Sequence, residues 1–112
     1  VIALAHRTNA AAPAIPVKDT VKLVQSGVVQ STPDRSSLRA IQTPQVFDAQ
    51  IFRAALQAAV ESGAEVTDDC SVMERIGKEI YLTDGSYENI KITTPEDMLL
   101  AAAILQRREE QP

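Results

Sequence analysis

Apolar positions along the chain follow two spacings, one typical of helices and one typical of strands. The clearest helical pattern covers residues 48–63, where Asp48 precedes apolar residues spaced three or four positions apart and Gly63 follows them. A shorter one covers residues 67–77, with Thr67 or Asp68 as its cap and Gly77 at its end. Both segments are predicted to be helices.

The last helix is predicted to start at Thr94-Pro95-Glu96-Asp97 and to end in solvent at about residue 110. A capping threonine, a proline in the first turn and acidic residues facing the helix dipole are all typical of a helix start. We expect this helix to bury a stripe made of Met98, Leu99, Ala102, Ala103 and Leu105.

Several short runs are predicted to be strands. Residues 10–17 are small and apolar, and their two prolines favour an extended strand at a sheet margin or its end. Residues 20–24 and 28–31 flank Gly27 and form a predicted hairpin, which is too small to be stable without packing on something outside its own domain. Further strands are expected at 39–47, where a proline loop closes the strand, at 79–83 and at 89–93.

The first residues, Val1 to Asn9, already show a helical pattern without a capping residue before it. We expect a fragment whose upstream part is missing, and a processed N-terminus is the alternative. The order of helices and strands predicts an α/β fold. With three or four strands, its parallel sheet would be incomplete.

Composition excludes several classes of protein. The 112 residues are 45% hydrophobic and 23% charged, as in globular domains, and carry a net charge of −4. This balance argues against a nucleic-acid partner. No apolar run approaches the roughly 18–20 residues that span a bilayer, so no membrane association is expected. A single cysteine, Cys70, suits the cytoplasm and is expected in the core, and the lone His6 is taken as a bystander.

Candidate chemistry lies where the predicted elements end, because ligands gather at the carboxyl ends of strands in open α/β sheets. Lys91 interrupts an apolar β run, and it is either a solvated lysine or a cation aimed at phosphate. Arg35 is either a surface arginine or a two-pronged phosphate ligand. Thr20 and Thr43 are hydroxyl donors or, more simply, a strand residue and a residue preceding a proline.

Thr67 suits a helix cap, and a helix start can also bind an anion or a hydroxyl group. Asp68 and Asp69 could bind a divalent metal through oxygen, but acids at a helix start are the simpler interpretation, and no metal site is assigned. The four glycines are isolated, so the chain has no Gly-rich phosphate loop. The residues alone predict an α/β half-domain with a possible phosphate site.

Taken together and in order, several motifs resemble the C-terminal half of the methylerythritol phosphate cytidylyltransferase family. Each motif is weak alone, but the series is specific and spans nearly the whole chain. The motifs are P-V-x-D-T at 16–20, D-R-x-x-L at 34–38, Q-T-P-Q at 42–45, T-D-D at 67–69 and N-I-K-I-T-x-P-E-D at 89–97.

The resemblance implies a Rossmann-like nucleotidyltransferase domain that joins CTP and 2-C-methyl-D-erythritol 4-phosphate and releases pyrophosphate. It also implies Mg²⁺ and a cytoplasmic homodimer in which a β-arm, at about residues 18–32, crosses to the partner. In the family pattern Lys91 stabilises negative charge on the phosphates. Arg35 and Thr20 reach the substrate of the neighbouring subunit. Thr43 and Thr67 line the substrate pocket.

One departure from the family is large, because its Gly-rich CTP loop and its metal-binding Asp match none of these residues. Residues 1–112 are therefore expected to be the C-terminal portion of one domain, unable to bind CTP well or to turn over alone. Two alternatives remain: a cytidylyltransferase for another polyol phosphate, such as ribitol 5-phosphate, or a non-catalytic dimerisation module.

Overall fold

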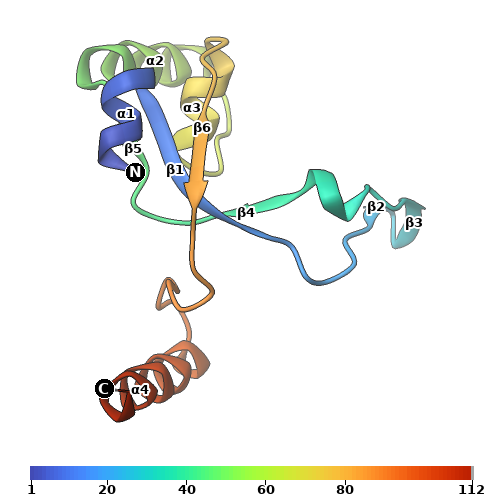
Figure 1. The fold of residues 1–112 in the computed structure, drawn as a ribbon. Coiled ribbons are helices and arrows are strands. Elements are labelled where there is room, and N and C mark those ends of the chain that lie inside the picture. Colours follow the sequence, from blue (N-terminus) through green and yellow to red (C-terminus); the bar gives the residue numbers. More distant parts are fainter. Residues whose placement is uncertain (112) are drawn as a thin grey trace.

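A computed structural model describes residues 1–111. Figure 1 shows a small helix-covered sheet from which the hairpin and the last helix extend in different directions. The radius of gyration of 17.0 Å exceeds the roughly 13 Å of a compact domain of this length, in agreement with this open shape. No helix within residues 1–111 is both long and apolar enough to cross a membrane.

Strand β1 (Ala10–Pro16) lies at the centre of the sheet and pairs along both of its edges. On one edge it runs parallel to β6 (Tyr81–Asp84), and on the other it runs antiparallel to β4 (Arg39–Ile41) and β5 (Val46–Phe47). The sheet is therefore mixed, whereas the sequence predicted a parallel one. The prolines also suggested a strand at the margin, but β1 is the central one.

The position of Pro13 explains how a central strand tolerates proline. Residues 14–16 of β1 pair with β4 and residues 10 and 11 pair with β5, so Pro13 lies opposite the gap between these two strands. Proline has no N–H to donate to a neighbouring strand. Pro44, inside the gap, lacks one as well, and the Thr43–Pro44 peptide bond is cis. The single strand predicted over 39–47 is therefore two short strands.

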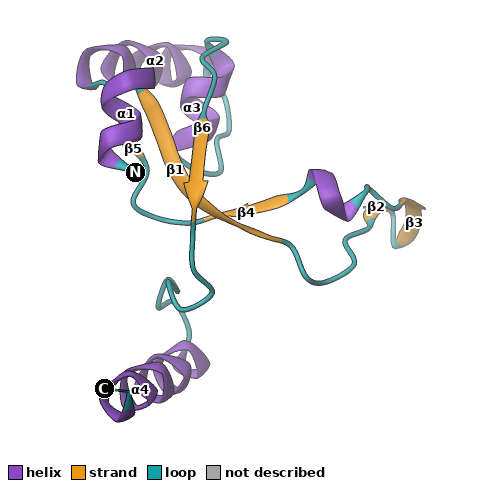
Figure 2. Ribbon diagram, viewed as in Figure 1, coloured by secondary structure: helices purple, strands orange, loops and turns teal. Residues whose placement is uncertain are grey.

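The helices cover only one end of this sheet (Figure 2). They are α1 (Ile2–Thr8), α2 (Ala49–Ser62) and α3 (Asp69–Arg75). The core consists of Ala10, Ala55, Val72 and Met73, with stacked Phe47 and Phe52 rings 5.1 Å apart beside it. Small side chains on β1 let the helices approach closely, which explains the alanine-rich sequence.

The predicted helix ends are largely confirmed. Asp48 caps α2 by accepting the Ile51 N–H, and Gly63 ends that helix in the left-handed conformation. For α3 the cap is Asp68, not Thr67, because the Asp68 carboxylate accepts the Ser71 N–H. Cys70 is buried next to it, as expected.

The hairpin forms as predicted, from β2 (Leu23–Gln25) and β3 (Val28–Ser31). It belongs to an extension of the chain, residues 18–32, that we call the arm. Its apolar residues face solvent, with Val28 61% and Val24 59% exposed. A short 3-10 helix, η1 (Arg35–Ser37), leads from the arm back to β4.

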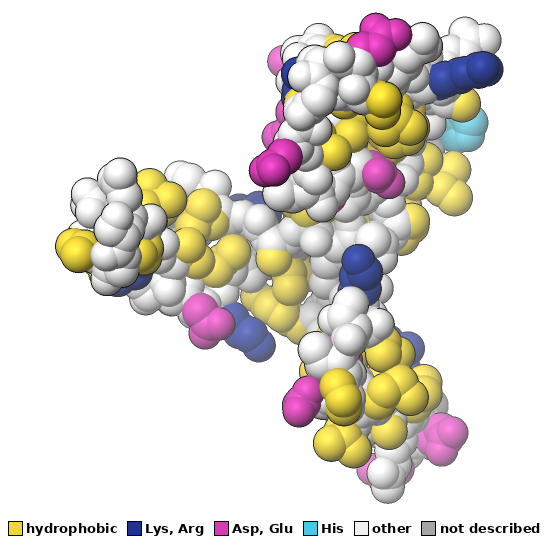
Figure 3. All heavy atoms as spheres, turned by 180° about the vertical axis from the view of Figure 1, so that it is seen from behind, with side chains coloured by type: hydrophobic (Ala, Val, Ile, Leu, Met, Phe, Trp, Pro, Cys, Tyr) yellow, Lys and Arg dark blue, Asp and Glu magenta, His cyan; other side chains and the backbone are white. Residues whose placement is uncertain are grey.

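Two sequence predictions about the C-terminal region are wrong. Residues 89–93 form no strand, because β6 pairs only with β1 and residues 85–94 leave the sheet as a loop, here called the Lys91 loop. Helix α4 (Pro95–Glu110) has no buried residue, and Leu99 is 75% exposed. Met98 and Leu105 are also more than half exposed, so no other segment within residues 1–111 buries the predicted stripe, and Figure 3 shows apolar side chains on the surface of this helix.

Thr94 caps the start of α4, as predicted, and its bonds form a capping box. Thr94 accepts the Asp97 N–H, while the Asp97 carboxylate accepts the backbone N–H of Thr94 and both the N–H and the hydroxyl of Thr93. The backbone N–H of Thr93 is the main cause that lowers the pKa of Asp97 to about 2.

Asp97 should therefore titrate near pH 2 when followed by carboxyl-carbon NMR. Because the folded-state pKa lies below the ordinary value of 3.8, this group stabilises α4 above about pH 4, and that contribution is lost as the pH falls toward 2. Thr93→Val removes one hydroxyl donor and should shift the titration upward. Titration of wild-type Asp97 at pH 3.8 would contradict the capping box.

Candidate functional site: the strand-end loops

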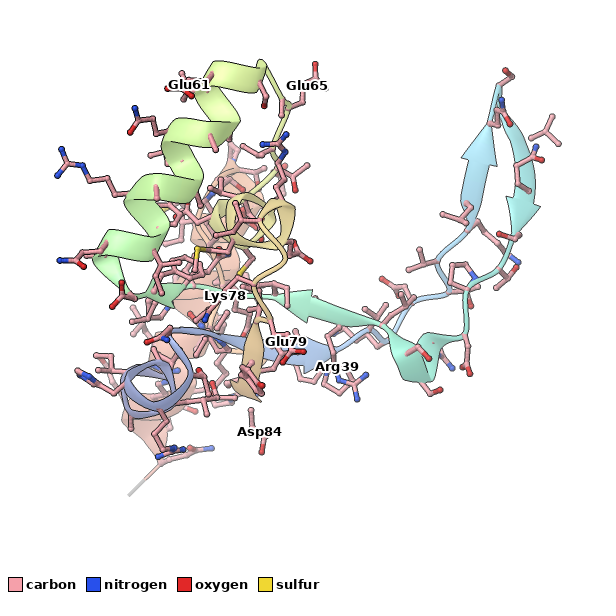
Figure 4. The ribbon with its side chains drawn as sticks, turned by 90° about the horizontal axis from the view of Figure 1, so that it is seen from above. Arg39, Glu61, Glu65, Lys78, Glu79 and Asp84 are labelled. Atoms are coloured by element: carbon pink, nitrogen blue, oxygen red, sulfur yellow. The ribbon has the colours of Figure 1, made fainter. Side chains whose placement is uncertain are left out.

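Strands β1 and β6 are parallel, so their carboxyl ends lie at the same edge of the sheet. The segments that follow these two ends carry candidate site residues. After β1 the chain enters the arm, and after β6 it enters the Lys91 loop. Figure 4 shows Arg39 where the arm joins the sheet and Asp84 at the end of β6. This edge is where open α/β sheets bind their ligands.

Gln42 connects the β4–β5 segment to the Lys91 loop. Its side-chain Nε2 donates to the Ser86 carbonyl at 2.7 Å and to the Asn89 carbonyl at 3.0 Å, and its Oε1 accepts the Ser86 N–H at 3.3 Å. Asn89 Nδ2 in turn donates to the Thr43 carbonyl at 2.8 Å. The predicted site residue Thr43 is thereby joined to the loop that carries Lys91.

Gln45 makes the equivalent connection to the start of α3. Its Nε2 donates to Asp68 Oδ2 at 3.3 Å, and its Oε1 accepts the Cys70 N–H at 3.0 Å. Thr67, next to Asp68, has its hydroxyl 3.0 Å from the Ser71 hydroxyl. The Q-T-P-Q motif thus holds Thr43 between the segments that carry Thr67 and Lys91.

Arg35 lies at the base of the arm and is connected to the Lys91 loop through Lys18. Arg35 Nη1 donates to the Lys18 carbonyl at 2.8 Å. The Lys18 ammonium lies 4.9 Å from the centroid of the Tyr87 ring, and the Tyr87 hydroxyl donates to the Pro16 carbonyl at 2.8 Å. Arg35 also lines an open pocket with Asp34, Ser36 and Arg39.

Two predicted residues have free side chains within residues 1–111. Lys91 is exposed and makes no hydrogen bond or salt bridge there, so its ammonium is available to a ligand. Thr20 is exposed on the arm and likewise has no side-chain hydrogen bond among the described residues. The structure therefore joins Thr43, Thr67 and the Lys91 loop into one region and leaves Thr20 apart from it.

Gln42, Gln45, Asn89 and Tyr87 connect the segments of this site, although the sequence did not predict a role for them. Two glutamines that flank Thr43-Pro44 were a usable signal, because a proline loop between two strands leaves backbone groups that amide side chains can satisfy. Only Thr43 was given a role in that motif.

The pKa shifts of ionisable groups near the site have clear structural causes. The side chain of Arg107, bonded to Glu88 at 3.0 Å, lowers the pKa of Glu88 in the Lys91 loop. The Ser36 N–H lowers the pKa of Asp34 next to Arg35. Burial raises the pKa of the Cys70 thiol to about 11, which makes it an unreactive core residue.

The residues present do not fit a magnesium ion. Both oxygens of Asp68 already accept hydrogen bonds, from Ser71 and Gln45. No group of three or more His, Cys, Asp or Glu side chains in the described part of the chain is arranged to bind a metal. Asp68 caps α3, and Asp69 lies in the first turn of that helix.

Comparisons with known proteins agree with the motif series. Residues 1–107 match the family model described as "IspD: 2-C-methyl-D-erythritol 4-phosphate cytidylyltransferase". This chain belongs to that cytidylyltransferase family. The family assignment made from the motifs is confirmed.

Two curated members of the family show how much of the protein is covered. The 2-C-methyl-D-erythritol 4-phosphate cytidylyltransferase of Desulforamulus reducens is 55% identical over 109 residues, which are 96% of this chain and 47% of that protein. The protein of the same name from Bacillus cytotoxicus is 50% identical over 96% of this chain and 49% of its own length. The chain spans about half the length of the curated relatives it matches.

Solved structures confirm the α/β nucleotidyltransferase fold. The 4-diphosphocytidyl-2C-methyl-D-erythritol synthase of Anaerococcus prevotii superposes with a TM-score of 0.85 at 37% identity over 94% of this chain and 48% of its own. The cytidylyltransferase of Thermus thermophilus gives a TM-score of 0.80 at 33% identity over 93% of this chain and 51% of its own.

Gly85 lies close to both the Gln42 side chain and β1, and it provides a test of this packing. A Cβ on residue 85 would overlap Gln42 Oε1 and lie 3.0 Å from the Ala14 carbonyl oxygen. Gly85→Ala should therefore lower the free energy of unfolding by about 1–3 kcal/mol in chemical denaturation. Adding Gln42→Ala removes the overlapping atom, so the double variant should lose less than the sum of the single losses. Simple additivity would contradict the described contact.

Proposed function

We propose that residues 1–112 form the C-terminal portion of an enzyme that joins CTP and 2-C-methyl-D-erythritol 4-phosphate. The products are pyrophosphate and CDP-methylerythritol, an intermediate of non-mevalonate isoprenoid biosynthesis. The observation that carries the proposal is the family match over residues 1–107. The proximity of the Q-T-P-Q and N-I-K motifs at one edge of the sheet supports it.

In this reaction an oxygen of the substrate phosphate attacks the α-phosphorus of CTP, and pyrophosphate leaves. Lys91 places its ammonium beside the phosphates and stabilises the negative charge that develops, which is the main contribution that a protein makes to phosphoryl-type transfer. The hydroxyls of Thr43 and Thr67 line the substrate pocket and orient the methylerythritol phosphate.

We propose that the arm crosses to the partner subunit of a homodimer. Val24, Val28 and Val29 on the arm are more than half exposed, which favours burial against a protein surface. Arg35 and Thr20 would then bind the methylerythritol phosphate of the partner's site, and Arg35 would do so with two parallel hydrogen bonds.

The CTP loop and the Mg²⁺ ligands would come from an N-terminal half that is not among these residues. The cytoplasm is the proposed location, in agreement with the single unpaired Cys70.

Site variants of the full-length protein test these assignments. Lys91→Ala and Arg35→Ala should each lower kcat/KM for methylerythritol phosphate by about 10²-fold or more, because each removes a cation from the reacting phosphates. Arg53→Ala, on the exposed face of α2, is the matched control and should leave the rate unchanged. Near-normal rates for both site variants would contradict the assignment.

The same assay separates the two remaining functions. A preference for ribitol 5-phosphate over methylerythritol phosphate would identify the other polyol phosphate, and inactivity with both would identify a dimerisation module.

Mixing the two inactive variants tests whether the arm acts in trans. A dimer of one Arg35→Ala chain and one Lys91→Ala chain has one site with both cations if Arg35 serves the partner. Random pairing should therefore restore about a quarter of wild-type turnover. An unchanged, near-zero rate would mean that Arg35 serves its own chain.

Calorimetric titration of the 112-residue chain with CTP should give no tight binding, since a Gly-rich loop that could bind its phosphates is missing from these residues. The full-length protein is the positive control. Tight binding by the short chain would contradict the proposed division of the enzyme.

A further inference from the structure

Residues 86–89 form the turn before Lys91. One side chain holds this turn by bonding to its backbone groups. Gln42 bonds to the Ser86 carbonyl, the Ser86 N–H and the Asn89 carbonyl. It therefore contacts both ends of the turn, and one planar amide sets the distance between them.

Gln42 is itself anchored to the centre of the sheet. Its backbone N–H donates to the Pro13 carbonyl of β1 at 2.9 Å, and its side chain is half-buried. The Gly85 N–H donates to the Ala14 carbonyl of the same strand at 2.8 Å. The turn is thus fixed to the central strand of the sheet.

Lys91 has no comparable support of its own. It lies two residues beyond Asn89 in a segment without strand pairing, and its side chain makes no bond within the described residues. The direction in which its backbone leaves the turn therefore depends on how the turn is held.

We propose that Gln42 is a positioning residue for Lys91. This inference rests on the function proposed above. By fixing the turn, Gln42 keeps the Lys91 ammonium directed at the reacting phosphates before the substrate arrives, so that no reorganisation is needed in the transition state. Asn89, whose side chain donates to the Thr43 carbonyl, assists from within the loop.

A double-mutant cycle in the full-length enzyme tests this proposal. Gln42→Met keeps the length of the side chain but removes its hydrogen bonds, and it should lower kcat by about tenfold with the KM for CTP within about twofold of wild type. In a Lys91→Ala background the same change should lower kcat by less than about twofold, because there is no ammonium left to position. The slow Lys91→Ala reaction is measured with enzyme in excess over substrate.

The outcomes separate the two proposals. An equal loss in both backgrounds, or no loss in the single variant, would overturn the role of Gln42. A Lys91→Ala enzyme as active as wild type would instead contradict the role that the proposed function gives to Lys91. Gln57→Met, on the exposed face of α2, is the matched control and should be neutral in both backgrounds.

Two further measurements cover a variant that folds poorly or a rate that is too low. Asn89→Ala loosens the same loop at an exposed position, so it takes the place of Gln42→Met in the cycle if that protein melts below the assay temperature. Trypsin cleavage after Lys91, relative to cleavage after Arg53, should be about tenfold faster in Gln42→Met, since an opened loop is cleaved more readily. Equal cleavage ratios in variant and wild type would overturn the proposal.

Discussion

Hydrogen bonding along both edges of β1 is the constraint on which the rest of this structure depends. Ala10, Ala11 and Ala12 are fully buried, so the strand can be covered only by elements that approach closely. The parallel pairing with β6 brings the start of the arm and the start of the Lys91 loop to one edge of the sheet. The antiparallel pairing with β4 returns the chain from the arm to the same place.

The gap between β4 and β5, opposite Pro13, allows the candidate site to form. Without a continuous strand at residues 42–45, the two glutamines of the Q-T-P-Q motif are free to bond to other segments. Gln42 bonds to the Lys91 loop and Gln45 bonds to the start of α3, and Thr43 lies between them. A local defect in strand pairing therefore determines which distant residues become neighbours.

Most of the elements and the family could be predicted from sequence, because caps, glycines and periodicity are local signals. Asp48, Gly63 and the Thr94 cap could be predicted on that basis, and the motif order identified the family. The predicted strand at 89–93 failed because β propensity shows that a segment can extend, but not whether a partner strand lies beside it. The burial of α4 failed for a related reason: an apolar stripe shows that a face suits burial, but not what covers it.

The site residues were only partly predictable for the same physical reason. Lys91, Arg35 and the threonines stood out by chemical type, whereas Gln42 and Asn89 act through partners more than forty positions away. Such pairings leave no periodic trace in a single sequence.

The long separation of these contacts also bears on how the protein folds. Gln42 meets Ser86 and Asn89 across 44 and 47 positions, and Tyr87 meets Pro16 across 71. The hairpin and the helices, in contrast, close over short stretches. Since closing a longer loop costs more chain entropy, the hairpin and the helices can form early and the strand-end loops last. The loops that carry the candidate site residues would then be the last part of the chain to acquire their shape after synthesis.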